Sequence, residues 1–301
     1  MTAIVVHGGA GATSPERHDR LREGVRAAAD AGDAILAAGG SALDAVVAAV
    51  RVLEDDPEFN AGLGSALTRD GAVETDASVM DGATQRVGAV AAVPDLGCAV
   101  ALARAVLDSG EHAILAGPAA WRFAEEVGLA RAPEGSLVTA RQLARWRDEV
   151  TRGAATSGGT VGACARDAQG HLAAATSTGG IMYKRAGRVG DSPVPGAGTW
   201  ADGHAAISAT GDGEAILRVA LARGVAARVA GGMTLRDAAA AGLDELRRVT
   251  AGSAGLVAVD ARGVVGVQLS ATMPVASVVR DGPTIARADS LGETLPPEAS
   301  R

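Results

Sequence analysis

The sequence predicts an α+β fold in which β-sheets lie between layers of helices. The main observation is the order of apolar patterns along the chain, because strand-like segments, helices, strands, helices and strands follow one another. A second observation is size and composition, since 301 residues with 48% hydrophobic and 21% charged side chains can bury a large core. Elements in this order bury their apolar faces when helical layers cover the sheets. The length alone fits one large domain or two ordinary ones.

The first half of the chain is predicted to alternate between strands and helices. Apolar residues at helical spacing predict the helices, and apolar runs bounded by polar turns predict the strands. Helices are expected over residues 20–38, 42–54, 98–107 and 119–127, and strands over residues 3–6, 72–80, 86–93 and 112–116. From residue 142 the chain turns charged, and residues 151–159 are small, polar and without periodicity, which is typical of an exposed, mobile linker.

The second half is predicted to begin with a hairpin. Residues 160–166 and 172–177 form its strands, and residues 167–170 form the turn. The later strands are expected over residues 205–209, 256–260, 264–269 and 277–279, and the helices over residues 214 to about 229 and 235–249.

Charge and composition exclude several classes of partner. The formal net charge is −7 and aromatic residues make up 2%, whereas nucleic acids and anionic membranes need a basic face and base stacking needs aromatic side chains. The chain has no apolar run long enough for a bilayer and does not start with a secretory pattern, so cytoplasmic residence is the expectation. Cys98 and Cys164 lie far apart without metal-ligand spacing, which predicts two buried small residues and no disulfide framework or zinc site.

The most informative segment runs from Ser157 to Ala165, where one threonine follows two glycines and starts an apolar strand. Gly159 has no Cβ, so its carbonyl can be approached closely. Attack of the Thr160 hydroxyl on this carbonyl would give an ester, and hydrolysis would leave Thr160 as a new N-terminus whose α-amine is a built-in base. On these residues alone, a glycine turn before a strand that begins with a β-branched residue is the favoured explanation.

Further motifs reverse that preference. In order, they are His7-Gly8-Gly9-Ala10-Gly11-Ala12, Phe59 to Gly64, Glu74 to Gly82, Ala175 to Gly180, Gly187 to Pro193 and Thr210 to Glu214. In this order and spacing, over nearly the whole chain, the sequence resembles the plant-type L-asparaginase and isoaspartyl peptidase family of N-terminal-nucleophile hydrolases. The resemblance implies a four-layer αββα sandwich and a single hydrolase domain over residues 1–301. It also implies self-cleavage between Gly159 and Thr160, giving residues 1–159, which end in a flexible linker, and residues 160–301, which start with the nucleophile.

The resemblance assigns catalytic roles to four residues. Thr160 is the nucleophile, and its α-amine, with a reference pKa of about 7.7 to 8.0, takes the hydroxyl proton. Thr178 orients the Thr160 hydroxyl, although β propensity alone also explains a threonine there. The Thr210 hydroxyl and the Gly211 N–H form an oxyanion hole, in which one donor is typically worth about 3 to 4 kcal/mol. A plain tight turn explains the glycines equally well.

The resemblance also assigns substrate binding to one loop. Arg188 and Asp191 flank Val189 and Gly190, and an arginine fork matches a carboxylate while an aspartate accepts from an ammonium group. The loop is therefore expected to bind the α-carboxylate and α-amine of an aspartyl substrate; the alternative is a surface ion pair worth little. By the same resemblance the substrate site is completed by Asn60, Thr210, Gly211, Asp212 and Gly213.

The loop before Gly64 resembles the family's sodium-binding loop. The resemblance implies that backbone carbonyls bind a structural sodium ion, because hard cations take oxygen ligands. These carbonyls belong to Leu53, Glu54, Asp56, Phe59, Ala61 and Leu63. A structural loop without bound metal is nearly as good an explanation. The turn at His7 lacks the pattern of a phosphate-binding loop and is expected to be structural.

Together these residues predict a self-cleaving amidohydrolase that hydrolyses L-asparagine and β-aspartyl dipeptides without an organic cofactor. The resemblance further implies a homodimer of processed chain pairs. A glycosylasparaginase usually has aspartate before the nucleophile, where this chain has Gly159, and a related threonine endopeptidase has a much longer linker. A non-catalytic amino-acid-binding homologue that does not self-cleave remains a further alternative.

Overall fold

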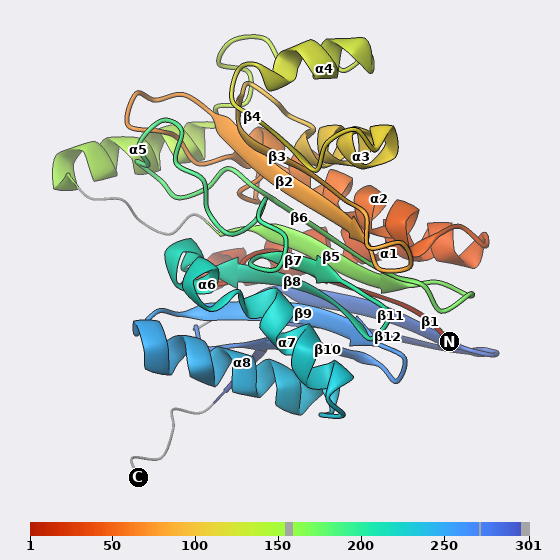
Figure 1. Cartoon of the computed structure of the whole chain (residues 1–301). Coiled ribbons are helices and arrows are strands. Elements are labelled where there is room, and N and C mark those ends of the chain that lie inside the picture. Colours follow the sequence, from red (N-terminus) through yellow and green to blue (C-terminus); the bar gives the residue numbers. More distant parts are fainter. Residues whose placement is uncertain (154–158, 271, 296–301) are drawn as a thin grey trace.

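Two β-sheets lie face to face in the middle of the computed structural model, which describes residues 1–153, 159–270 and 272–295 (Figure 1). Across the large sheet the strands are β12 (Thr284–Ser290), β11 (Val275–Asp281), β1 (Thr2–His7), β5 (Val161–Arg166), β6 (Leu172–Thr178), β2 (Glu74–Asp81), β3 (Val87–Pro94) and β4 (Ile114–Ala116). Across the small sheet they are β13 (Glu293–Thr294), β10 (Val264–Gln268), β9 (Ala254–Asp260), β8 (Ala205–Gly211) and β7 (Thr199–Ala201).

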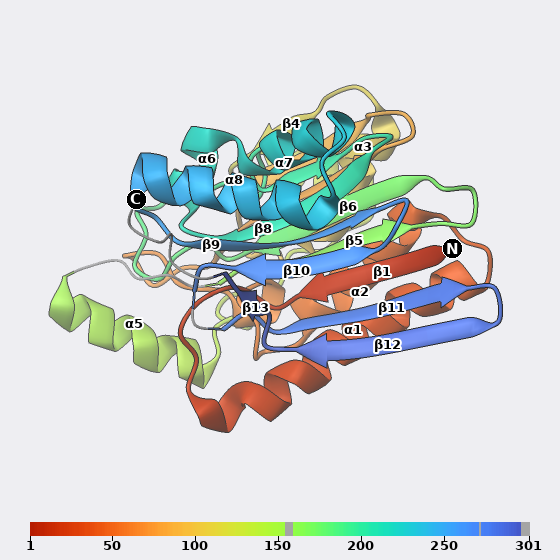
Figure 2. The ribbon, with the colours of Figure 1, turned by 90° about the horizontal axis from the view of Figure 1, so that it is seen from below.

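Helices cover the outer face of each sheet. The helices α1 (His18–Ala37), α2 (Ala42–Asp55) and α3 (Ala99–Ser109) pack on the large sheet, and α7 (Leu221–Ala230) and α8 (Leu235–Thr250) pack on the small one. Figure 2 shows α1 and α2 below the large sheet and α5 (Ala140–Arg152) standing apart from both sheets. The remaining short helices are η1 (Pro15–Arg17), η2 (Gly62–Gly64), α4 (Ala120–Glu126) and α6 (Gly213–Val219).

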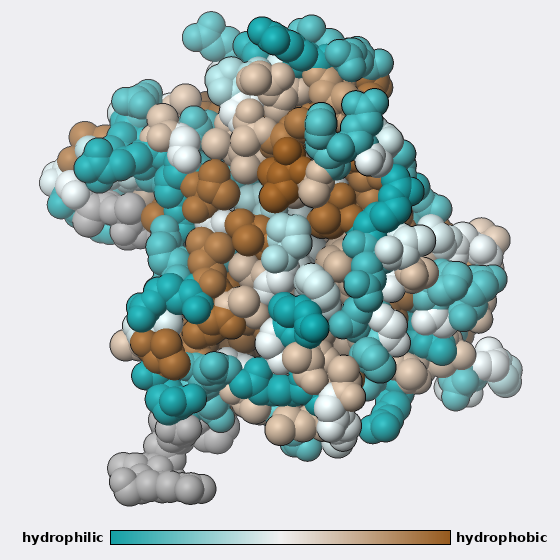
Figure 3. Space-filling view, in the orientation of Figure 1, coloured by the Kyte–Doolittle hydropathy of each residue, from teal (hydrophilic) through white to brown (hydrophobic). Residues whose placement is uncertain are grey.

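Small side chains in the central strands allow this close stacking. The strands β5 and β6 are buried on both faces, between α2 on one side and the small sheet on the other. Their antiparallel pairing places Ala163 opposite Ala175 and Cys164 opposite Ala174. A strand covered on both faces reads as a continuous apolar run. On the outside, Figure 3 shows hydrophilic residues over α4 and apolar residues gathered in the centre of the same face.

Helices and strands occur at nearly all the predicted places, with three kinds of difference. The helix expected from residue 214 to about 229 is two helices, because Ala220 takes left-handed backbone angles between them. The helix α5 was not predicted, and its buried residues include the polar Gln142 and Glu149. Three strands were also not predicted: β7 and β13 are very short, and β12 is an exposed edge strand.

The two cysteines are both free, and only Cys164 is buried, while Cys98 is partly exposed. No helix in the part of the chain that the structure describes is both long and apolar enough to cross a membrane. The predicted linker at residues 151–159 falls mostly outside the described residues, which resume at Gly159.

Candidate active site

Thr160 lies directly before the central strand β5 and is 6% exposed. The turn after β1 passes immediately behind it. A Cβ atom added to Gly9 would lie 3.0 Å from the Thr160 nitrogen and 3.1 Å from the Gly159 Cα, and Gly9 has a φ of +103°. Glycine is suited to this position because it tolerates the positive φ and has no Cβ to collide with the neighbouring backbone. The glycine-rich turn therefore packs its backbone against the Gly159–Thr160 peptide.

Two side chains donate hydrogen bonds to the carbonyl of Gly159. The Asn60 Nδ2 lies 2.7 Å and the Thr178 Oγ1 lies 3.1 Å from this oxygen. The Thr160 hydroxyl in turn donates to Thr178 Oγ1 at 3.3 Å. The structure therefore brings Asn60, Gly159, Thr160 and Thr178 together, and two donors aimed at one carbonyl oxygen can stabilise negative charge on it.

Thr210 and Gly211 approach the same place from the small sheet. Thr210 is buried on β8, and its hydroxyl accepts a hydrogen bond from the Ala10 N–H at 3.1 Å. Gly211 has a φ of +137°, and a Cβ there would lie 2.5 Å from the Ser253 carbonyl oxygen. The side chain of Asp212 caps α6 by accepting from the Ala215 N–H.

A small cavity joins these residues to the predicted substrate loop. Its walls include Gly159, Thr160, Thr178, Arg188, Gly190, Asp191, Gly211 and Gly213. Among the predicted site residues, Val189, Thr210, Asp212 and Asn60 are not part of this wall. The cavity measures about 10 Å³, room for about one water molecule. A substrate therefore does not fit into this cavity as the structure shows it.

Arg188 does not pair with Asp191, although the sequence suggested opposite charges acting together. Its guanidinium forms a two-pronged ion pair with Glu214, with Nε–Oε1 and Nη2–Oε2 distances of 3.0 and 2.7 Å. Asp191 is buried, its Oδ2 has no hydrogen-bond partner among the described residues, and burial raises its pKa to about 7. Sequence reasoning missed Glu214, although it is the last residue of the motif that starts at Thr210.

A buried chain of hydroxyl groups lies behind the substrate loop and joins the two sheets. From the large sheet, His7 Nε2 lies 2.9 Å from Ser208 Oγ, which lies 2.7 Å from Thr176 Oγ1. Thr199 Oγ1 lies 2.6 Å from Thr176 Oγ1 and 3.2 Å from the carbonyl oxygen of Ser192, the residue after Asp191. Burial lowers the pKa of His7 to about 3, so its imidazole is neutral. Sequence reasoning gave these hydroxyls no role, although Thr176 lies in the motif from Ala175 to Gly180.

Carbonyl groups of the predicted sodium loop lie close to its glycines. A Cβ on Gly62 would lie 2.4 Å from the Glu54 carbonyl oxygen, and a Cβ on Gly64 would lie 1.9 Å from the Phe59 carbonyl oxygen. The Asp56 and Ala61 carbonyls already accept backbone N–H groups. The structure gives no common point for the six carbonyl oxygens, so the sodium ion stays a prediction, and among the described residues no cluster of His, Cys, Asp or Glu side chains could hold a metal.

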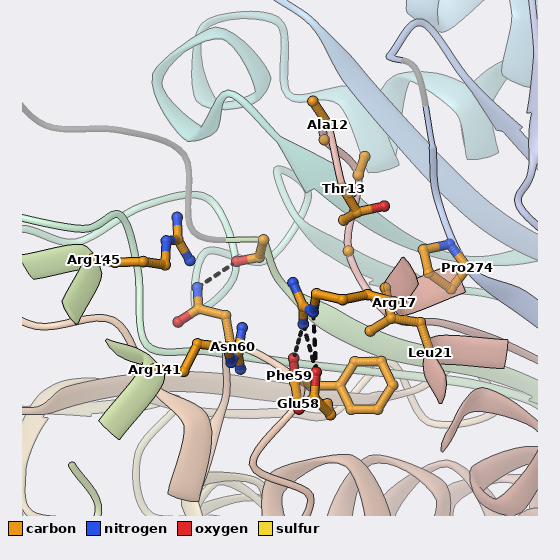
Figure 4. A pocket seen from close by; sticks show the side chains of 15 residues that line it. Ala12, Thr13, Arg17, Leu21, Glu58, Phe59, Asn60, Arg141, Arg145 and Pro274 are labelled. Atoms are coloured by element: carbon orange, nitrogen blue, oxygen red, sulfur yellow. Dashed lines mark hydrogen bonds and ion pairs between the residues drawn. The ribbon is translucent and has the colours of Figure 1, made fainter. Parts of the chain in front are cut away.

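A larger cavity of about 380 Å³ lies on the other side of Gly159 (Figure 4). Its walls include the turn at residues 8–13, Asn60 and Gly159. Three arginines line it: Arg17, Arg141 and Arg145. Arg17 pairs with Glu58, with Nη2 and Oε2 2.8 Å apart. Nothing in the sequence pattern indicated this cavity, since α5 supplies two of its arginines and was itself not predicted.

Comparison with known proteins agrees with this geometry. A family model described as Asparaginase matches residues 1–285. The isoaspartyl peptidase/L-asparaginase of Mus musculus is 46% identical over 284 residues, covering 91% of this chain and 87% of the mouse protein. The Homo sapiens protein of the same name is 45% identical over 288 residues, 93% of each chain. The plant-type L-asparaginase of Pyrobaculum calidifontis is 44% identical over 276 residues, 87% of this chain and 92% of the archaeal protein. The chain belongs to the asparaginase family.

Proposed function

We propose that this protein is a self-processing threonine amidohydrolase that hydrolyses L-asparagine and β-aspartyl dipeptides. The observation that carries the proposal is the Gly159 carbonyl, which accepts from Asn60 and Thr178 while the Thr160 hydroxyl bonds to the same Thr178. The names of the relatives support the substrate class. The order helices, sheet, sheet, helices supports an αββα sandwich of the N-terminal-nucleophile hydrolase type, formed by one domain over residues 1–301.

Self-processing begins with attack of Thr160 Oγ1 on the Gly159 carbonyl carbon. A C–O bond forms, the C–N bond breaks, and the hydroxyl proton ends on the freed Thr160 nitrogen. Water then hydrolyses the ester, which leaves a carboxylate on Gly159 and a free α-amine on Thr160. The Asn60 and Thr178 donors stabilise the oxygen that becomes negative in the first step.

Hydrolysis of a substrate reuses the freed threonine. The α-amine takes the Thr160 hydroxyl proton as the oxygen attacks the β-carbonyl, and then gives it to the leaving nitrogen as the C–N bond breaks. Water then hydrolyses the ester on Thr160, which releases aspartate and restores the hydroxyl. The Thr210 hydroxyl and Gly211 N–H stabilise the oxyanion. Arg188 binds the α-carboxylate in place of Glu214, and Asp191 accepts from the α-ammonium group.

Two further features belong to the proposal. Backbone carbonyls of the loop over residues 53–63 would hold a sodium ion, and the bound ion would fix the loop that carries Asn60. The processed chains are expected to pair as a homodimer.

Intact mass under denaturing conditions tests the proposal, followed by ammonia release from L-asparagine. An aged wild-type sample should give fragments 1–159 and 160–301, and Thr160→Ala should stay one chain. Thr160→Ser keeps a hydroxyl nucleophile and should still be cleaved. A folded wild-type protein that keeps only the full-length mass would contradict self-processing.

A further inference from the structure

The arginine-lined cavity beside Gly159 has more positively than negatively charged side chains in its wall. The whole chain carries a formal net charge of −7, yet the cavity wall contains three arginines and a single acidic residue, Glu58. Glu58 already pairs with Arg17. The two remaining arginines come from α5, and Figure 4 shows them on the same side of the cavity as Asn60.

The guanidinium of Arg141 has N–H groups that can bind a ligand. It donates to the Pro57 carbonyl, and within the described part of the chain it forms no ion pair. Burial, together with the charge of Arg17, holds the pKa of Arg141 below its usual range. An arginine in such surroundings is stabilised by an anion, and a planar carboxylate fits its fork of donors.

The position of the cavity relative to Thr160 indicates which carboxylate it receives. The proton taken by the Thr160 α-amine must return to the leaving nitrogen, so that nitrogen has to lie within hydrogen-bond reach of the Thr160 nitrogen. Gly9 packs against the Thr160 nitrogen, and both Gly9 and Gly159 line the arginine cavity. Thr160 itself does not line the cavity, but a nitrogen that leaves beside Gly9 and Gly159 lies next to two residues of the cavity wall.

We propose that the arginine cavity is the leaving-group subsite for β-aspartyl dipeptides, in which Arg141, next to Arg145, binds the free α-carboxylate of the departing amino acid. The inference rests on the proposed hydrolase function and deepens it, because ammonia leaving from asparagine has no carboxylate to bind. A cavity of about 380 Å³ is within the size range of small-molecule pockets. A second carboxylate could come from Gly159 itself after cleavage, and the experiment separates the two sources.

The test uses the processed wild-type protein with three substrates: β-aspartyl-leucine, its C-terminal amide and L-asparagine. The wild type should hydrolyse the free acid with a kcat/KM about tenfold above that of the amide. Arg141→Gln should remove this preference while the value for asparagine stays the same. Arg141→Lys keeps the positive charge and should retain part of the preference. Arg147→Gln, an exposed arginine of the same helix outside the cavity, should behave like the wild type.

Several results would overturn the inference. Equal values for acid and amide in the wild type would mean that the cavity does not bind the leaving group, as expected if the Gly159 carboxylate occupies it. If kcat/KM of Arg141→Gln falls equally for all three substrates, Arg141 acts on structure, through its hydrogen bond to the Pro57 carbonyl, and not on the leaving group. The proposed hydrolase function survives both results and fails only if neither asparagine nor the dipeptide is hydrolysed, in which case this inference fails with it.

Discussion

Glu214 forms an ion pair with the guanidinium group of Arg188, which the family resemblance assigns to the substrate carboxylate. The ion pair is bidentate, and its two side chains are 15% and 58% exposed. A partly exposed pair of this kind contributes little to stability, so a substrate carboxylate can displace it. Under the proposed function, the Glu214 carboxylate therefore competes with the substrate carboxylate for Arg188.

Glu214→Gln should lower the KM for L-asparagine about two- to fivefold, because Arg188 no longer has to give up a charged partner. Steady-state kinetics of the processed protein measure this change. Glu293→Gln is the matched control, since it removes an exposed ion pair with Arg236 at the far strand β13. A higher KM in Glu214→Gln would show that Glu214 positions Arg188 rather than competing for it.

At the scale of elements, the hydroxyl chain connects β6 and β2 of the large sheet to β7 and β8 of the small one. It ends on the Ser192 carbonyl, which also accepts from Ser78 at 2.6 Å. The stacking of the two sheets thereby fixes the backbone beside Asp191. Buried hydroxyls that are all satisfied hold one arrangement, and removing one leaves its neighbours without a partner.

Thr199→Val should therefore raise the KM for L-asparagine on the order of tenfold, with a smaller effect on kcat. It should also lower the free energy of unfolding by about 1 to 3 kcal/mol. Thr75→Val is the control, because Thr75 is a buried threonine whose hydroxyl bonds to the Val93 and Leu96 carbonyls and not, among the described residues, to the hydroxyl groups that join the two sheets. If both variants raise KM equally, the effect comes from lost stability and not from the position of Ser192.

The helix α5 shows why one element escaped prediction. Its packing against the body of the protein uses apolar and polar contacts. Leu143 and Trp146 pack against the small core cluster that contains Leu67 and Met182. Gln142 donates to the Gly64 carbonyl, and Trp146 donates to the Thr68 carbonyl. Leu143, Trp146 and Val150 keep helical spacing, but charged and polar side chains dominate the segment from residue 142, so its composition favours an exposed linker over a helix. The cavity that α5 helps to form was missed for the same reason.

At the scale of the whole molecule, burial of Asp191 links stability to pH. Its pKa rises from 3.8 to about 7 in the folded chain, so over this range the folded chain keeps a proton that the unfolded chain has lost. Below about pH 3.8 the Asp191 carboxyl is neutral in both states and burial carries no charge penalty. As the pH rises toward 7, the unfolded chain is favoured because its carboxyl ionises in water, so the free energy of unfolding falls.

Asp191→Asn removes this dependence. In the uncleaved Thr160→Ala background, the variant should become more stable relative to its parent by up to about 1.4 kcal/mol per pH unit between about pH 4 and 7. Urea unfolding of both proteins at several pH values measures the difference. A difference that stays constant over this range would contradict the raised pKa of Asp191.

Much of the architecture could be predicted from the sequence alone. Strands β1, β5 and β6 and helices α1, α2 and α8 lie within a few residues of their predicted bounds, because a buried face imposes a period that is local to each segment. The candidate catalytic residues were identified by the family resemblance of several motifs in register, because each motif alone is explained equally well by a glycine turn. Their roles remain predictions for the experiments above.

Only the tertiary structure decided which polar side chains meet. The pair Arg188 and Glu214, the hydroxyl chain through Thr199, and the approach of Arg141 to Gly159 each join residues on different elements. These contacts depend on the stacking of two sheets and on where α5 docks, and neither leaves a periodic signal in the sequence. Hydrophobic burial is encoded residue by residue, whereas the partner of a buried polar group is settled only when distant segments pack together.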